Sequence, residues 1–391
     1  MKYDFDEEID RRGTGALKYD ALAERYGNAE LFPLWVADMD FAVCPEITAA
    51  LQKRLSHPVY GYAQTPNSYW LTVMRWLNKH FRLDVKREEL NYIPGVVKGI
   101  SFAINYFTQK GDKVLIQPPV YHPFRMVTEG NGRIVVNNPL VRTTGGYQMD
   151  FTALEATVKA ERPKLMILCN PHNPGGIKWT AAQLAEVARI ARQNSMIVIS
   201  DEIHADIMLD GEPHVSFLTA GDDAREVGIV FGAPSKTFNI AGLVSSWAVI
   251  QNPKLRKGFY EWLDVNEFSD PTFISTIAAE AAYSNGEPWL EQMIDYINGN
   301  IDATEKYLAE NVPSIKMIRP QASFLVWLDC RQLGLSQKEL VSLFVDKAGL
   351  ALNDGEMFGK EGVGYMRLNV GTNRANILKS LEKLKNAVDS L

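Results

Sequence analysis

The chain has 391 residues, of which 46% are hydrophobic, and a formal net charge of -6 at pH 7. This length allows a large core and two domains, whereas the acidic balance argues against nucleic acid or an acidic membrane surface as the main partner, because both bind clustered lysine and arginine. The three cysteines, Cys44, Cys169 and Cys330, are far apart and lack CxxC spacing, so neither a disulfide framework nor a zinc site is predicted.

The N-terminal ten residues are acidic and contain no apolar signal core, and no stretch is apolar and long enough to span a bilayer. We therefore expect a cytoplasmic protein without a membrane partner.

The segment before about residue 34 is charged and contains three glycines, a pattern that predicts an extended arm followed by one short helix. Pro45 predicts the start of a helix that continues to about Leu55. A glycine and proline turn with Tyr60 and Tyr62 then leads into a further helix over residues 70–77.

From Tyr92 onward, short apolar runs alternate with amphipathic helices, which is typical of an α/β domain. The strands are expected near residues 92–93, 113–117, 133–137, 164–169, 196–200, 228–232 and 247–250. Two of these runs are continuously apolar, as expected for strands covered on both faces of a parallel sheet. Thr180 and Gln183 form a capping-box pattern, which predicts the start of a helix between the strands at residues 164–169 and 196–200.

After about residue 285 the pattern changes to a long helix with Pro288 near its start, followed by strand, strand, helix, strand, strand and helix. We predict a large domain over residues 45–285. A smaller α+β domain is predicted from residues 1–44 together with residues 286–391.

Four motifs follow predicted strands, at the sheet edge where parallel sheets bind ligands. A glycine turn precedes the helix that starts near Val96, and the free N–H groups of such a helix start can bind phosphate. Tyr121 lies between prolines and can stack on a planar ring, while Asn173 can donate a hydrogen bond to a ring oxygen. Asp201 ends the most apolar strand and needs a partner, because an unpaired buried charge is costly.

Each motif also has a structural interpretation as a stiff turn or a packed loop. A metal site formed by Asp201, His204 and Asp206 is a further alternative, which the remote cysteines and the lack of a second ligand cluster disfavour.

Lys236 lies among small and hydroxyl residues in an apolar segment, residues 231–242. Desolvation disfavours the charged form of a lysine, which makes the amine a Schiff-base nucleophile. A surface turn with an exposed lysine is the alternative. Near the C-terminus, Arg367 offers the bidentate donors that a substrate carboxylate requires, although an exposed strand arginine would fit the same pattern.

Together these motifs resemble the fold-type I pyridoxal 5'-phosphate enzymes, the aspartate aminotransferase superfamily, over essentially the whole chain. Residues 34–41, 200–206 and 233–242 are similar to the C-S lyase subgroup, which includes bacterial cystathionine β-lyases and cystalysin. This resemblance implies an α/β large domain with a mostly parallel sheet between helices, a smaller α+β domain built from both termini, pyridoxal 5'-phosphate as cofactor, and a homodimer.

The resemblance also implies a role for each matching residue. Lys236 would form the Schiff base with the cofactor, Asp201 would pair with the pyridine nitrogen, and Asn173 would meet the phenolic oxygen. Tyr121 would stack on the ring. The phosphate would be bound by Val96, Val97 and Ser235, with Tyr62 reaching it from the partner subunit. The substrate carboxylate would meet Arg367 and the backbone at Ala37, with Asn173 and Tyr62 also near the substrate.

Two positions depart from the wider aminotransferase pattern. Residues 243–246 lack the arginine with which many of those enzymes hold the phosphate, and His204 occupies a position where a tyrosine often approaches the ring oxygen. Both features are similar to the C-S lyase subgroup. The expected activity is therefore β-elimination on a sulfur-containing amino acid, in methionine and cysteine metabolism, giving a thiol, pyruvate and ammonia.

Two other functions remain open on the sequence. One is an aminotransferase that uses a keto acid acceptor, since the same residues serve both reactions. The other is a regulatory protein that retains the fold, which the presence of both Lys236 and Asp201 disfavours.

Overall fold

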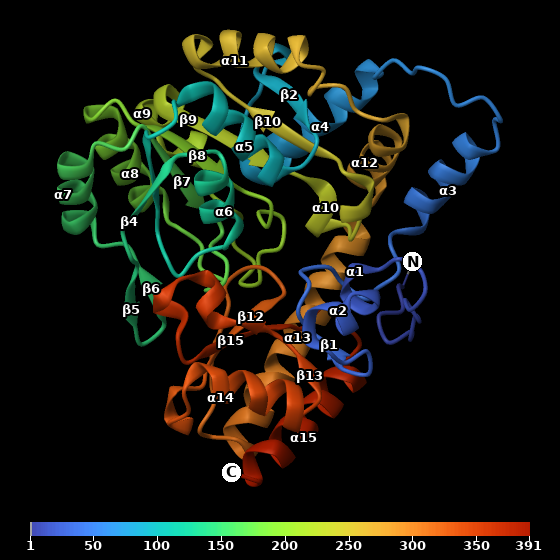
Figure 1. Ribbon diagram of the computed structural model, residues 1–391. Helices are drawn as coiled ribbons and strands as arrows, with labels where there is room; N and C mark the ends of the chain where they lie inside the picture. Colours follow the sequence, from blue (N-terminus) through green and yellow to red (C-terminus); the bar gives the residue numbers. More distant parts are fainter. Residues whose placement is uncertain (1) are drawn as a thin grey trace.

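A seven-stranded sheet forms the centre of the computed structural model, which describes residues 2–391 (Figure 1). Its strands are β2 (Leu90–Ile93), β3 (Lys113–Ile116), β4 (Ile134–Asn137), β7 (Leu165–Cys169), β8 (Ile197–Asp201), β9 (Gly228–Gly232) and β10 (Ser246–Val249). The spatial order is β2-β10-β9-β8-β7-β3-β4. Strand β10 alone runs opposite to the other strands of the sheet, so the prediction of a mostly parallel sheet is confirmed.

Helices cover both faces of this sheet, because alternate residues of each central strand pack against different layers. Ile229 and Phe231 belong to the cluster under α5, α6 and α11, whereas Val230 belongs to the cluster on the other face. The helices before residue 286 are α3 (Pro45–Leu55), α4 (Asn67–Phe81), α5 (Val96–Phe107), α6 (Pro123–Gly130), α7 (Phe151–Glu161), α8 (Ala181–Gln193), α9 (Asp222–Val227), α10 (Pro234–Thr237), α11 (Pro253–Val265) and α12 (Phe273–Asn285). Short 3-10 turns lie at η1 (Arg87–Glu89), η2 (Phe217–Ala220) and η3 (Ala241–Leu243).

Several of these helices begin as the sequence predicts. Pro45 is the first residue of α3, and the Thr180–Gln183 capping box starts α8. Gly95 precedes α5 with a φ of +116°, a conformation that favours glycine. An additional strand pair, β5 (Val141–Thr143) and β6 (Gly146–Gln148), forms a hairpin beside the sheet.

The chain after residue 286 forms a second layer, drawn in orange and red at one end of the molecule (Figure 1). An antiparallel sheet with the order β11-β12-β15-β14 packs with three helices. Its elements are α13 (Glu287–Asn311), β11 (Lys316–Ile318), β12 (Leu325–Asp329), α14 (Gln337–Ser342), β14 (Asn353–Asp354), β15 (Tyr365–Asn369) and α15 (Arg374–Asp389). A π-helical turn, η5 (Leu343–Lys347), follows α14, and 3-10 turns lie at η4 (Arg331–Leu333), η6 (Gly355–Phe358) and η7 (Lys360–Gly362).

The N-terminal segment contributes to this second layer. Strand β1 (Phe32–Pro33) pairs in parallel with β13 (Leu350–Ala351), and the N-terminal elements lie beside the C-terminal ones (Figure 1). The prediction of a single short helix in the arm was wrong, because two helices form, α1 (Leu17–Asp20) and α2 (Leu22–Tyr26). The division at residues 44 and 285 into two domains stays a prediction.

Within residues 2–391, no helix combines the length and the apolar composition that crossing a membrane would require.

Candidate active site

A cavity of about 290 Å³ opens at the edge of the seven-stranded sheet where the parallel strands end. All but two of the site residues predicted from the sequence line it: Ala37, Val96, Val97, Tyr121, Asn173, Asp201, His204, Ser235 and Lys236. The exceptions are Arg367, which donates a hydrogen bond to Asn173, and Tyr62. The volume is close to the lower end of the range for small-molecule sites, about 300–1,000 Å³.

The strand directions explain why these residues meet. Asp201 is the last residue of β8, and the segments with Tyr121 and Asn173 follow β3 and β7. Strand β10 runs in the opposite direction, so it begins at the edge where the other strands end, and its first residue, Ser246, also lines the cavity. Residues at or just beyond the ends of six strands, β2, β3, β7, β8, β9 and β10, therefore line the cavity together.

Lys236 lies in α10, directly after β9, and its ammonium group donates to the Ala37 carbonyl oxygen. Burial lowers the pKa of Lys236 to about 8, and the negative charge of Asp38 opposes this effect. A substantial fraction of the amine is therefore neutral near pH 8, as a nucleophile or a proton acceptor requires.

Asp201 is buried, with 3% of its surface exposed, and accepts a hydrogen bond of 3.1 Å from the Ile203 N–H. Burial raises the pKa of Asp201 to about 7, and the nearby Glu202 adds to the shift. A cationic N–H group in the cavity would favour the ionised carboxylate, because an opposite charge offsets the cost of desolvation. A protonated pyridine nitrogen has this chemistry.

Arg367 is also buried, and burial lowers its pKa to about 10. Its Nη1 donates to Asn173 Oδ1 at 3.0 Å, and its Nη2 donates to the Trp35 carbonyl oxygen at 3.0 Å and to Asn353 Oδ1 at 2.6 Å. The buried Nε group has no partner within residues 2–391. An unpaired guanidinium donor this deep is costly unless an anion binds it, which fits a substrate carboxylate.

His204 lines the cavity beside these groups, with its Nδ1 3.0 Å from Ser323 Oγ. Burial lowers the pKa of His204 to about 3, so the ring is neutral at physiological pH. Asp206, the third residue of the alternative metal site, instead accepts from Trp76 Nε1 at 2.8 Å and from Thr237 Oγ1 at 2.6 Å. Across residues 2–391, no group of three or more histidine, cysteine, aspartate or glutamate residues has the arrangement of a metal site.

The start of α5 and the β9–β10 loop form the end of the cavity that suits a phosphate. The amides at a helix N-terminus lack intrahelical partners and bind anions. Two residues that the sequence interpretation missed also lie here, Lys98 on α5 and Ser246 on β10. Lys98 was overlooked because it follows the two valines of the helix-start motif, although a side chain in the first turn of a helix points back towards the N-terminus.

Tyr62 lies outside this cavity. Its side chain is fully exposed and lines a separate groove with residues 260–273. A single chain therefore does not bring Tyr62 to the other predicted residues.

The residues at the cavity fit pyridoxal 5'-phosphate group by group. A lysine amine with a lowered pKa suits the aldehyde, a buried carboxylate suits the ring nitrogen, and helix amides suit the phosphate. Tyr121 offers an aromatic face beside them.

The family of class I and II aminotransferases matches residues 29–384 of the chain. Cystathionine beta-lyase PatB of Bacillus subtilis is 39% identical over 98% of this chain and 99% of its own length. The crystal structure of cystalysin from Treponema denticola, which contains pyridoxal 5'-phosphate, has a TM-score of 0.96 at 33% identity, and the match covers all of both chains. The PLP-bound C-S lyase from Staphylococcus hominis has a TM-score of 0.92 at 33% identity, over 99% of this chain and 98% of that one.

Proposed function

The chain belongs to the class I and II aminotransferase family, and we propose that it is a pyridoxal-phosphate-dependent carbon–sulfur lyase acting on sulfur-containing amino acids. One observation carries this proposal: Lys236 and Asp201 line one cavity, and the buried, partly unpaired Arg367 donates to Asn173 in its wall, in a chain with cystathionine β-lyase and C-S lyase relatives. The reaction converts the amino acid and one water into a thiol, pyruvate and ammonia.

The substrate carboxylate binds the free Nε side of Arg367, which Asn173 and Asn353 hold in a fixed orientation. The Ala37 backbone lies near the same end of the substrate, since Ala37 lines the cavity. This anchoring sets the substrate's Cα–H bond towards Lys236.

The Lys236 amine takes the proton from Cα, which its lowered pKa allows near neutral pH. When bound, pyridoxal 5'-phosphate supplies the electron sink that stabilises the resulting negative charge. Asp201 holds a proton on the pyridine nitrogen, so its negative charge supports that sink. The sulfur group then leaves from Cβ with the bonding electron pair, and Lys236, which carries the proton taken from Cα, can return it to the leaving thiolate.

The phosphate end of the site combines the α5 amides at Val96 and Val97, Ser235 and, in this proposal, Lys98. His204, which is neutral, and Tyr121 both line the cavity, where Tyr121 would stack on the ring and His204 would lie near it. A cationic Lys98 supplies the charge that the missing arginine in residues 243–246 would otherwise provide.

The protein is proposed to act as a homodimer in which Tyr62 reaches the partner's phosphate site. Its full exposure, beside the exposed Val59 and Tyr60, supports this arrangement. The three cysteines are buried and free, which suits the reducing cytoplasm proposed as its location.

The central test is an assay for pyruvate. Purified enzyme loaded with pyridoxal 5'-phosphate is incubated with cystathionine, cystine or cysteine and no keto acid. We expect pyruvate in step with thiol release, and Lys236→Ala is expected to lose both the activity and the visible absorbance of the bound cofactor. Amino-group transfer that needs an added keto acid would instead identify an aminotransferase.

A further inference from the structure

Residues 36–41, here called the bridge, run between the Lys236 side of the cavity and the Arg367 side. Lys236 donates to the carbonyl oxygen of Ala37, and Arg367 donates to that of Trp35, just before the bridge. Five of the six backbone carbonyl oxygens along this segment accept from side chains that are distant in sequence, and the Met39 N–H donates to another such side chain. Such a density of specific contacts exceeds what an ordinary loop requires.

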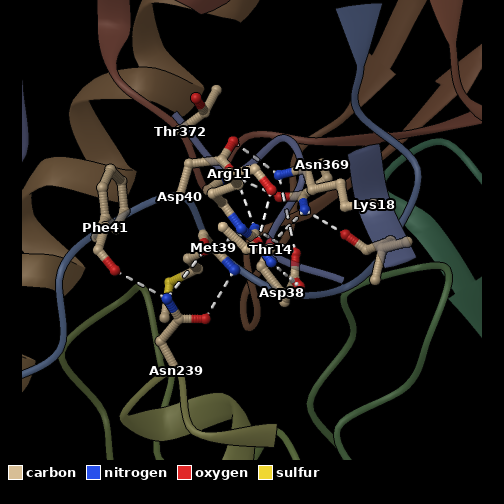
Figure 2. A network of polar contacts seen from close by, with 12 residues as sticks. Arg11, Thr14, Lys18, Asp38, Met39, Asp40, Phe41, Asn239, Asn369 and Thr372 are labelled. Carbon is tan, nitrogen blue, oxygen red and sulfur yellow. Dashed lines mark hydrogen bonds and ion pairs between the residues drawn. The ribbon is translucent and has the colours of Figure 1, made fainter. Parts of the chain in front are cut away.

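Asn239 holds the bridge from the lysine side, three residues after Lys236. Its Oδ1 accepts from the Met39 N–H at 3.0 Å, and its Nδ2 donates to the carbonyl oxygens of Met39 and Phe41, both at 2.9 Å (Figure 2). Asn239 has a φ of +57°, a left-handed conformation that asparagine tolerates better than most residues.

Asn369 holds the bridge from the arginine side, two residues after Arg367. Its Nδ2 donates to the carbonyl oxygens of Val36 at 2.6 Å and Asp38 at 2.7 Å. The Gly371 N–H donates to Asn369 Oδ1 at 2.7 Å, and the Gly371 carbonyl accepts from the Asp40 N–H at 2.8 Å. The two asparagines therefore hold successive parts of the same short segment, Asn369 at Val36 and Asp38 and Asn239 at Met39 and Phe41.

Two cations of the N-terminal arm hold the bridge carboxylates. Arg11 donates to Asp38 Oδ2 at 2.6 Å and to Asp40 Oδ1 at 2.8 Å, while the fully buried Lys18 donates to Asp40 Oδ2 at 2.8 Å (Figure 2). The four charges balance, so this side of the bridge is fixed without a net buried charge.

We propose that the bridge sets the position of Lys236 relative to Arg367, with Asn239 and Asn369 as positioning residues and with Arg11 and Lys18 fixing its outer side. The inference rests on the proposed function for its catalytic consequence. It adds that residues touching neither cofactor nor substrate determine whether the amine reaches Cα of an anchored amino acid.

The test compares two glycine variants of the full-length protein. Asn239→Gly keeps the left-handed backbone available and removes the three bridge contacts. Asn194→Gly is the matched control, because Asn194 Nδ2 donates to the Ile190 carbonyl oxygen at 2.8 Å on α8, outside the active-site cavity.

The first readout is the reactivity of the Lys236 amine in the cofactor-free chain. It is measured by reductive methylation across a range of pH, with mass spectrometry of the peptide that contains Lys236. Asp38, Asp201, Arg367, Tyr121 and His204 face the amine, and all five stay intact in both variants. We expect faster methylation in Asn239→Gly, because the amine is released from the Ala37 carbonyl, and no change in Asn194→Gly.

The second readout is steady-state kinetics of the holoenzyme. Asn239→Gly is expected to lower kcat by about ten- to a hundredfold, since a small misplacement of reacting groups has effects of this size, with KM changing much less. Arg11→Met is expected to shift both readouts in the same direction and Arg11→Lys to restore part of the loss. This pair also tests the proposal if Asn239→Gly does not fold.

A folded Asn239→Gly protein with wild-type methylation and wild-type kcat would overturn the proposal, as would a variant that loses only thermal stability. The methylation readout needs neither cofactor nor substrate. A failure of the proposed lyase function would therefore be seen in the pyruvate assay alone and would leave the bridge measurement interpretable.

Discussion

Lys98 lies at the third position of α5 and lines the cavity, and its side chain makes no hydrogen bond or ion pair with any other described residue. Of the basic side chains that line this cavity, Lys236 is assigned to the cofactor aldehyde, which leaves Lys98 to face the phosphate. A phosphate with nearly two negative charges gains from a nearby ammonium, although solvent screening limits the effect at an exposed position.

Lys98→Met is therefore expected to weaken pyridoxal 5'-phosphate binding by about threefold to tenfold, as for a partly screened ion pair. Absorbance or fluorescence titration of the cofactor-free enzyme measures the dissociation constant. The difference from wild type should shrink at high salt. Lys338→Met, which removes an exposed lysine on α14, is the charge-matched control. Equal binding by the two variants would show that Lys98 does not bind the phosphate.

The sequence is sufficient to predict individual site residues, but not the hydrogen-bond partners of their side chains. Asp201 and Asn173 could be identified because each follows a predicted strand, and parallel strand ends share one edge. The contact between Asn173 and Arg367 could not be predicted, because it joins residues 194 positions apart through packing of the two sheets. The unpaired Arg367 Nε likewise depends on what surrounds it rather than on its own motif.

At the scale of elements, Asp206 joins helix α4 to α10. One carboxylate oxygen accepts from Trp76 on α4 and the other accepts from Thr237 on α10, next to Lys236. Burial raises the pKa of Asp206, and the two hydrogen bonds oppose that shift. The carboxylate is thus a structural contact behind the reactive lysine.

Asp206→Ala should leave the Trp76 N–H and the Thr237 hydroxyl without acceptors. We expect the free energy of unfolding to fall by about 2–4 kcal/mol, which is typical of breaking a buried hydrogen-bond network. Urea unfolding measures this change. Asp206→Asn keeps an acceptor for Trp76, so its loss should be smaller. Equal losses for the two variants would contradict the assigned contacts.

The sequence predicts elements well where an apolar run or a helical repeat is bounded by turn residues. The seven strands of the central sheet were expected within a few residues of their observed bounds, because each is an apolar run between turn residues. The pairing of β1 with β13 was not, since each strand has two residues and their partners are more than 300 positions apart. The second arm helix was missed for a related reason, as α1 and α2 are too short for a helical repeat.

At the scale of the whole molecule, the exposed segment around Tyr62 lies outside the active-site cavity of its own chain. Val59, Tyr60 and Tyr62 are all more than half exposed. A closed dimer with twofold symmetry would cover this segment twice and would place each Tyr62 at the other subunit's cavity.

Mixing of inactive variants tests this arrangement. Tyr62→Ala and Lys236→Ala proteins are unfolded together and refolded at equal concentrations. Each mixed dimer should contain one intact site, so about a quarter of wild-type activity is expected from random pairing. Each variant refolded alone provides the baseline. Activity at that baseline in a mixture shown to contain mixed dimers would rule out a shared site.

Strands β9 and β10 pair antiparallel, so the loop between them begins and ends at the same edge of the sheet. Because Gly232 and Trp247 are paired across the sheet, residues 233–245 form a loop whose two ends are tied together. That loop carries Lys236 and, through Ala241 and Val244, part of the cavity wall. The reactive amine and this part of the cavity wall therefore lie on one loop that the sheet holds at both ends. Arg367 and the bridge come from elsewhere in the chain, so a change in those segments can move the carboxylate anchor relative to the amine while this loop keeps its own geometry.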